Sequence, residues 1–299
     1  WFKKETKNMS RRQIAQELEC NFNTSGDTVV HPDDLARINE TVAEPVYRTG
    51  FDRNFWIWEK YQEGCTYLLA ADVARGDGAD NSVFHVVKID TMEVVAEYQG
   101  KPNLDLFAQI LFSAGVEYGK CLLVVENNGI GISVLEKLIN LQYPNLYYSI
   151  KSTHEFIESV RAEHNDRAVP GFTTSTKTRP LIVAKLEEFI RNKIITIYSS
   201  RTFHEFKTFI WNNGKPEAMR SYNDDLVMCM AIACWVRDTA LQANERDTQY
   251  KKAILDSMYL QSTKMNTTIK GMEGHNKTTQ EKAHEFKEEM KNFAWIFKG

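Results

Sequence analysis

Carboxylates stand at the ends of the three most apolar segments of the chain. They are Asp72 after TYLLAA, Glu126 after CLLVV, and Asp224 with Asp225 before LVMCMAIACWV. Aspartate is disfavoured in strands, and carboxylates are seldom buried without partners. Two strands that end at one edge of a sheet, and a helix that begins there, would bring these side chains together, at the place where open α/β folds bind ligands.

Clustered carboxylates repel one another, so such a cluster is expected to bind cations. Oxygen ligands suit Mg²⁺, which commonly binds to a few carboxylates and to substrate phosphates. Two metal ions a few ångströms apart can activate a water molecule and stabilise the leaving oxygen of a phosphodiester. The residue types therefore favour phosphodiester chemistry over a site built from His or Cys.

Each carboxylate also has an ordinary structural explanation when it is considered alone. Asp72 precedes a glycine-rich turn and could cap it, and Glu126 precedes Asn-Asn-Gly and could belong to a turn. Asp224 or Asp225 could simply cap the helix that follows. The metal site is favoured because all of them border strongly apolar segments.

The net charge, the cysteine spacing and the length of the longest apolar run exclude several classes of protein. The 299 residues carry a formal net charge of -3, whereas a protein that coats nucleic acid non-specifically is usually basic. A nucleic-acid partner must therefore bind to a local patch. The five cysteines form no C-x-x-C pair, which argues against zinc and against a disulfide framework. The longest apolar run, 226–236, is too short to cross a membrane and is typical of a buried helix.

The apolar patterning predicts a mixed α/β fold. Segments 66–74, 82–90 and 92–100 are expected to form a three-stranded antiparallel meander, and 121–126 and 146–150 to be further strands. Helices are expected at 104–119, 132–141, 180–192 and 221–241. His85 is expected to alternate away from the apolar face of its strand and to be an ordinary strand residue.

The polar stretch 154–179 is predicted to be a functional loop. It carries basic residues beside hydroxyl side chains, a combination suited to DNA phosphates. The candidate DNA contacts are Arg161, Arg167, Lys177 and Arg179. A solvated surface loop is the alternative. Pro180 is expected to open the next helix and to hold Arg179 in an extended conformation at its entrance.

Four segments in this order resemble the nuclease domain of the large terminase subunit of tailed bacteriophages, of the T4-like type. They are AADVARGDGADNSVFHVV, LLVVENNGIGISVLEKL, GFTTSTKTRPLIVAKLEEFI and YNDDLVMCMAIACWV. The resemblance covers roughly residues 45–240. It implies an RNase H-like mixed sheet, with three antiparallel strands plus parallel strands, flanked by helices. It divides the chain into the end of a preceding ATPase domain and linker (1–45), the nuclease domain (46–243) and a partly helical extension (244–299).

The resemblance also implies a Mg²⁺-dependent endonuclease that cuts concatemeric viral duplex DNA during genome packaging in the host cytoplasm. Asp72, Glu126, Asp224 and Asp225 are then metal ligands for two Mg²⁺ ions, which Mn²⁺ could replace. Asp72, Glu126 and Asp225 are the catalytic members. The implied partners are double-stranded DNA, the portal protein, the small terminase subunit and the ATPase domain of the full-length protein, with no membrane.

One feature departs from the full-length family pattern. The chain contains no G-x-x-x-x-G-K-[ST] segment, so no ATPase activity is expected of it. Two alternatives to a terminase nuclease stay open: another RNase H-like nuclease, of resolvase or recombinase type, and a non-catalytic module that docks on the portal.

Overall fold

The computed structural model describes residues 28–50, 52–75, 78, 80–151, 157–160 and 168–238. Most of the predicted ATPase-linker segment and the whole predicted C-terminal extension lie outside this range, as do Arg161 and Arg167. Within the described residues, no helix is long and apolar enough to cross a membrane.

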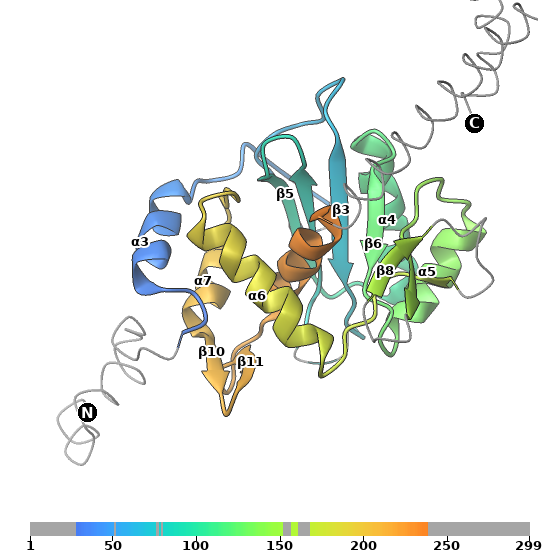
Figure 1. Ribbon diagram of the computed structural model, residues 1–299. Helices are drawn as coiled ribbons and strands as arrows, with labels where there is room; N and C mark the ends of the chain where they lie inside the picture. The colour runs from blue at the N-terminus through green and yellow to red at the C-terminus, as the bar shows by residue number, and fades with distance from the viewer. Residues whose placement is uncertain are drawn as a thin grey trace, which may run out of the picture. The chain divides into compact units, whose positions relative to one another are not determined.

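A six-stranded mixed sheet forms the centre of the described fold (Figure 1). Its strands are β1 (Tyr47–Thr49), β2 (Phe55–Ile57), β3 (Tyr67–Asp72), β4 (Ser82–Lys88), β5 (Glu93–Gly100) and β6 (Leu122–Val125). Their order in space is β1-β2-β5-β4-β3-β6. Only β3 and β6 pair in parallel in this sheet. The predicted meander is thus confirmed as β3, β4 and β5, and the helices that flank the sheet confirm the predicted fold class.

Two smaller sheets complete the described strands. One contains β7 (Tyr148–Lys151), β8 (Ile157–Val160) and β9 (Val169–Pro170), and the other contains β10 (Phe209–Asn212) and β11 (Lys215–Ala218). The strand expected at 146–150 therefore begins two residues later, and Leu146 makes only an isolated parallel bridge to Leu123. The pairing of β1 with β2 was not predicted, because each has only three residues and β1 is exposed along its length.

The β10–β11 hairpin was not predicted either. Asn213 and Gly214 connect its strands with φ angles of 49° and 78°. Positive φ at both central residues is typical of a type I′ turn, for which Asn-Gly is a strong sequence signal.

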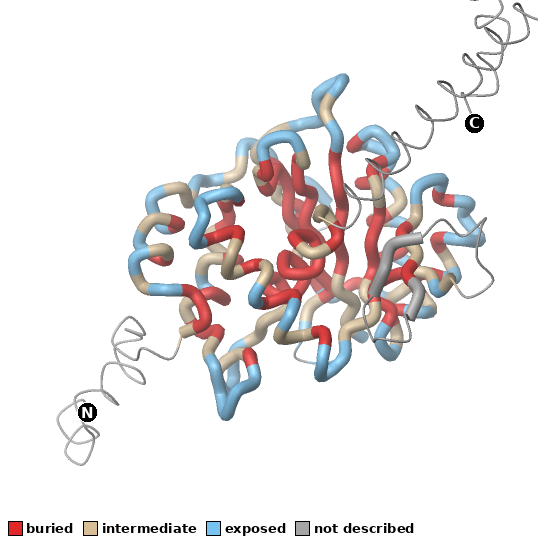
Figure 2. Tube along the Cα trace, in the orientation of Figure 1, coloured by how far each residue is buried: buried red, intermediate tan, exposed pale blue. Residues whose placement is uncertain are grey.

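Helices cover both faces of the central sheet. They are α3 (Pro32–Thr41), α4 (Leu104–Glu117), α5 (Gly131–Asn140), α6 (Thr178–Arg191), α7 (Ser200–Thr208) and a last described helix at residues 225–238, drawn in dark orange and unlabelled in Figure 1. Burial on both faces explains why β3 and β6 are continuously apolar rather than alternating. Figure 2 shows the central strands and the 225–238 helix mostly buried.

The two faces contain separate cores. On the first face, Leu68, Ala70 and Val124 pack with α6, α7 and the 225–238 helix. On the second face, Leu69 and Val125 pack with α4 and α5. We call these the first face and the second face below.

Candidate metal centre

The parallel pairing of β3 and β6 places Asp72 next to Glu126. Ala71 is in register with Val125, and the Glu126 amide donates to the Ala71 carbonyl at 2.9 Å. One residue further along each strand, Asp72 and Glu126 are neighbours at the carboxyl edge. Since side chains alternate along a strand, both lie on the first face, with Ala70 and Val124.

Asp225 approaches this edge from the beginning of the 225–238 helix. The helix starts here because the Met228 amide donates to the Asp224 carbonyl at 2.9 Å. Asp225 Oδ2 accepts hydrogen bonds from the Asn81 amide at 2.8 Å and from Asn223 Nδ2 at 3.2 Å. Asn81 immediately precedes β4, so these contacts fix Asp225 beside the strand that neighbours β3.

Asp72 is close enough to both of the other carboxylates to feel their charges. Burial raises the pKa of Asp72 well above its usual range, and the charge of Glu126, a hydrogen bond to Glu126 and the charge of Asp225 raise it further. Burial also raises the pKa of Asp225, although the Asn81 amide opposes this rise. The structure therefore brings Asp72, Glu126 and Asp225 to one end of the sheet.

The carboxylate oxygens of these three residues are the kind of ligand that a hard divalent cation such as Mg²⁺ prefers. Glu126 and Asp225 raise the pKa of the buried Asp72 carboxyl, and a cation bound between such carboxylates would relieve their repulsion. Among the described residues, however, no three His, Cys, Asp or Glu side chains already surround a single metal position. To share one ion, the three carboxylates would have to move closer together than they lie in this structure.

Asp224 has a different set of contacts from Asp225. Its Oδ2 accepts a short hydrogen bond from Arg179 Nη2, with which it forms an ion pair, and a second from the Ala218 amide at 3.2 Å. Arg179 Nε also donates to the Pro216 carbonyl at 3.0 Å. Asp224 thus connects the helix to α6 and β11, while Asp225 faces the edge of the sheet.

The loop after β6 supports Glu126. Asn128 Nδ2 donates to Glu126 Oε1 at 2.9 Å and to the Thr174 carbonyl at 2.6 Å. Gly131, the first residue of α5, passes so close that a Cβ atom there would lie 1.9 Å from the Glu126 carbonyl oxygen. Any larger residue at 131 would therefore displace the backbone that carries Glu126.

The described basic residues of the predicted DNA-binding loop lie at the beginning of α6. Lys177 is exposed, and Arg179 is partly buried in its pair with Asp224. The expectation that Pro180 opens the helix is wrong: α6 begins at Thr178, and Arg179 is helical. Ser175 explains the earlier start, because its hydroxyl accepts from the Thr178 amide at 3.1 Å, and proline is tolerated throughout a first turn.

His85 differs from its expected position. Both faces of β4 are covered, so no polar face exists for it, and its side chain is completely buried on the first face. Its Nε2 lies 3.0 Å from the Leu226 carbonyl oxygen. Two buried carboxylates, Glu97 and Glu205, were also missed, although a Glu in the middle of the strand EVVAEYQG, after the apolar VVA, was a usable signal for Glu97.

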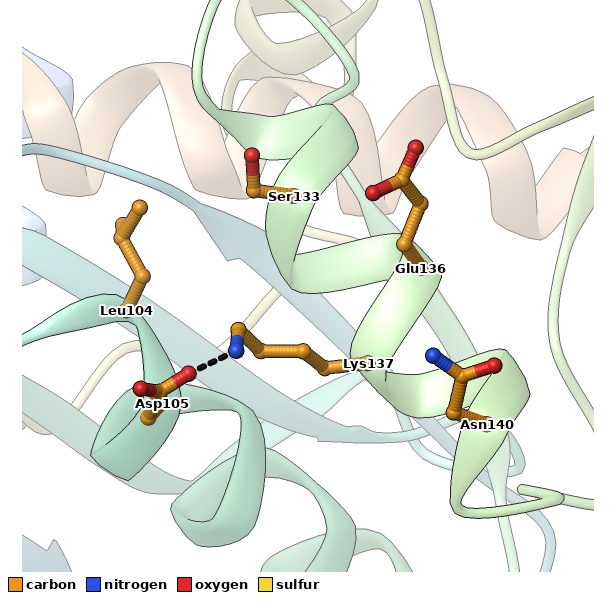
Figure 3. A pocket seen from close by; sticks show the side chains of 6 residues that line it. All are labelled: Leu104, Asp105, Ser133, Glu136, Lys137 and Asn140. Carbon is orange, nitrogen blue, oxygen red and sulfur yellow. Dashed lines mark ion pairs between the residues drawn. The ribbon is translucent and has the colours of Figure 1, made fainter.

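A surface hollow of about 560 Å³ lies away from this centre, between α4 and α5 (Figure 3). Its lining includes Ser133, Glu136 and Asn140, and Lys137 forms an ion pair with Asp105 across it. None of the three carboxylates at the sheet edge lines it, so we do not assign the chemistry to this hollow.

Solved structures with the same fold were found. The large terminase nuclease from thermophilic phage G20c with bound cobalt is 18% identical, with a TM-score of 0.53, over 70% of this chain and 96% of that chain. The same phage's nuclease with bound magnesium is 16% identical, with a TM-score of 0.52 and the same coverage. No protein-family model matches the sequence. The chain therefore has the RNase H-like fold of large terminase nuclease domains.

Proposed function

We propose that this chain is a metal-dependent endonuclease that cuts concatemeric viral duplex DNA during genome packaging, as the nuclease part of a large terminase subunit. The observation that supports this best is the meeting of Asp72, Glu126 and Asp225 at one edge of a fold shared with phage terminase nucleases. The G20c nuclease structures contain magnesium or cobalt, which supports a divalent cation here.

In this proposal Asp72, Glu126 and Asp225 hold two Mg²⁺ ions, and Mn²⁺ can replace them. When bound, such ions activate water and stabilise the leaving oxygen of a phosphodiester. The protein positions Glu126 through Asn128 and Asp225 through the Asn81 amide. Asp224 is proposed as an accessory ligand. Its ion pair with Arg179 fixes its position next to Asp225.

The substrate is held by its phosphates. Lys177 and Arg179 stand at the entrance of α6, and Arg161 and Arg167, which lie outside the described residues, precede them in the sequence. Such contacts position a duplex without reading its sequence, which suits an enzyme that cuts at many places. The ATPase domain of the full-length protein, the portal and the small terminase subunit are the proposed protein partners.

Plasmid cleavage tests the proposal. Purified protein should nick and linearise supercoiled plasmid in Mg²⁺ or Mn²⁺, with little sequence preference, and EDTA should stop the reaction. Ca²⁺ should support cleavage poorly, because its looser coordination positions water and phosphate less strictly. Cleavage that persists in EDTA would exclude the metal mechanism, and cutting confined to junctions or to one sequence would favour a resolvase or recombinase.

A further inference from the structure

We propose that Glu205 and His85 form a buried clamp on the backbone of Leu226 and thereby position Asp225. The inference rests on the proposed function, because the purpose of the clamp is to set the geometry of a metal-binding carboxylate. Both are positioning residues: their described hydrogen bonds to the 225–238 helix are to Leu226 and Val227, not to Asp225 itself.

The clamp holds both polar backbone groups of the residue after Asp225. Glu205 Oε2 accepts from the Leu226 amide at 2.8 Å and from the Val227 amide at 3.2 Å. His85 Nε2 lies 3.0 Å from the Leu226 carbonyl oxygen. Since a carbonyl only accepts, His85 carries its proton on Nε2. Strand β4 and helix α7 therefore hold the same peptide from two sides.

The first amides of the 225–238 helix need hydrogen-bond acceptors from outside the helix. The first amides of a helix have no partner within the helix, and the residue before it commonly supplies one. Asp224 occupies that place, but its Oδ2 accepts from Arg179 and from the Ala218 amide. Glu205 accepts from the helix amides instead. The start of the helix is thus fixed by a distant element rather than by its own cap.

The clamp is itself held rigidly. Glu205 is 8% exposed and His85 is completely buried. Glu97 Oε2 accepts from Thr202 Oγ1 at 2.6 Å, so β5 and α7 are joined beside the clamp. Burial lowers the pKa of His85, which keeps the ring neutral. Burial also raises the pKa of Glu205 to about 9, so near pH 7 its role needs an acceptor oxygen rather than a charge.

Variants at position 205 test the clamp, with two measurements for each. One is the rate of plasmid cleavage as a function of Mn²⁺ concentration, and the other is Mn²⁺ affinity measured by calorimetry without DNA. Glu205→Ala should weaken Mn²⁺ binding at least tenfold and slow cleavage about a hundredfold, because small misplacements of catalytic groups have costs of this size. Glu205→Gln keeps an acceptor oxygen and should stay within about threefold of wild type in both.

Tyr143→Phe is the matched control. It removes another buried hydrogen bond, from Tyr143 Oη to the Cys121 carbonyl at 2.6 Å, but on the second face. It should lower stability without changing Mn²⁺ affinity. If Glu205→Ala does not fold, His85→Phe replaces it, because this change removes the donor to Leu226 and keeps an aromatic ring of similar size.

The outcomes separate the clamp from the proposed function. Folded Glu205→Ala or His85→Phe with wild-type Mn²⁺ affinity overturns the clamp, and so does a Gln variant as impaired as the Ala variant. Wild-type protein that neither binds Mn²⁺ nor cleaves DNA overturns both proposals. Active wild type with a weakened Ala variant and a near-normal Gln variant supports both.

Discussion

The two faces of the central sheet are built for different tasks. The second face, under α4 and α5, is filled mainly by aliphatic and aromatic side chains, and its Tyr118 and Tyr143 hydroxyls reach backbone carbonyls. Its one buried charge among the described residues is Lys88, which is paired with the partly exposed Glu59. The first face, under α6, α7 and the 225–238 helix, has an apolar core but also buries ionisable side chains. These are His85, Glu97 and Glu205, with Asp72, Glu126 and Asp225 at its edge.

The second face therefore contributes mainly to stability, whereas the first face carries the side chains that could do chemistry. Burial of a carboxylate is costly, and several of the first-face groups have pKa values raised by that burial. The second face stabilises the sheet through close apolar packing and bears none of that cost. Substitutions on the first face should therefore change activity and pH dependence most, and those on the second face should change stability.

The largest effect is expected from the carboxylates at the edge. Asp72→Asn, Glu126→Gln and Asp225→Asn should each slow plasmid cleavage about a thousandfold, because each loses several kcal/mol of transition-state stabilisation by bound metal. In EDTA, Asp72→Asn should melt at or above the wild-type temperature, since it relieves repulsion. Asp33→Asn, at an exposed carboxylate in α3, is the control and should cleave normally. Full activity in any of the three variants would remove that residue from the centre.

A second-face cavity should produce the reverse pattern. Phe107 is completely buried in α4 and packs near Phe84 and Tyr98. Phe107→Ala should lower the free energy of unfolding by about 3–5 kcal/mol, measured by urea denaturation. The fraction that stays folded should keep its Mn²⁺ affinity. A variant of wild-type stability but lost metal binding would contradict the division between the faces.

Glu205 should give stability a characteristic pH dependence. Its pKa is raised to about 9 from an ordinary 4.5, by burial and by the charges of Asp225 and Glu97. The folded protein therefore holds a proton that the unfolded chain releases above about pH 4.5. This contribution is greatest below that pH and is lost as the pH rises towards 9. Melting temperatures from pH 5 to 9 should fall less steeply for Glu205→Gln than for wild type, and equal slopes would contradict the assignment.

The smallest effect is expected from the phosphate contacts. In an Asp72→Asn background, Lys177→Ala should reduce the salt slope of log K for duplex DNA by about one. Arg179→Ala should reduce it by less, because Asp224 already neutralises part of its charge. Binding titrations over a salt series measure both slopes. If neither slope changes, the entrance of α6 does not contact phosphates.

The sequence predicted those features that depend on neighbouring residues. The meander and the 225–238 helix follow from apolar patterning, and Asp72, Glu126 and Asp225 were selected because carboxylates interrupt that patterning. Their role as metal ligands stays a prediction. The residue patterning could not show which of Asp224 and Asp225 is the principal ligand, and the preference for Asp225 came from the resemblance alone. The difference in their contacts depends on Arg179, which lies far away in the chain and reaches Asp224 only in the folded protein.

The clamp was also beyond sequence reasoning. Glu205 lies in a short amphipathic stretch, where a carboxylate usually faces solvent, and it is buried where α7 packs against β5 and the 225–238 helix. His85 was misjudged because alternation along a strand has no polar side when helices cover both faces. Gly131 likewise has a role only because α5 begins against the Glu126 carbonyl.

The late position of the 225–238 helix in the sequence affects the order in which the fold can form. The helix follows all six strands of the central sheet, and a long connection containing α5, α6 and α7 separates it from β6. Contacts that close long loops form slowly, because the chain loses entropy before it gains packing. We therefore expect the sheet to form first, with Asp72 and Glu126 already adjacent and Asp225 still absent. The metal centre would then be completed only when the helix docks, so nuclease activity would report the last step of folding.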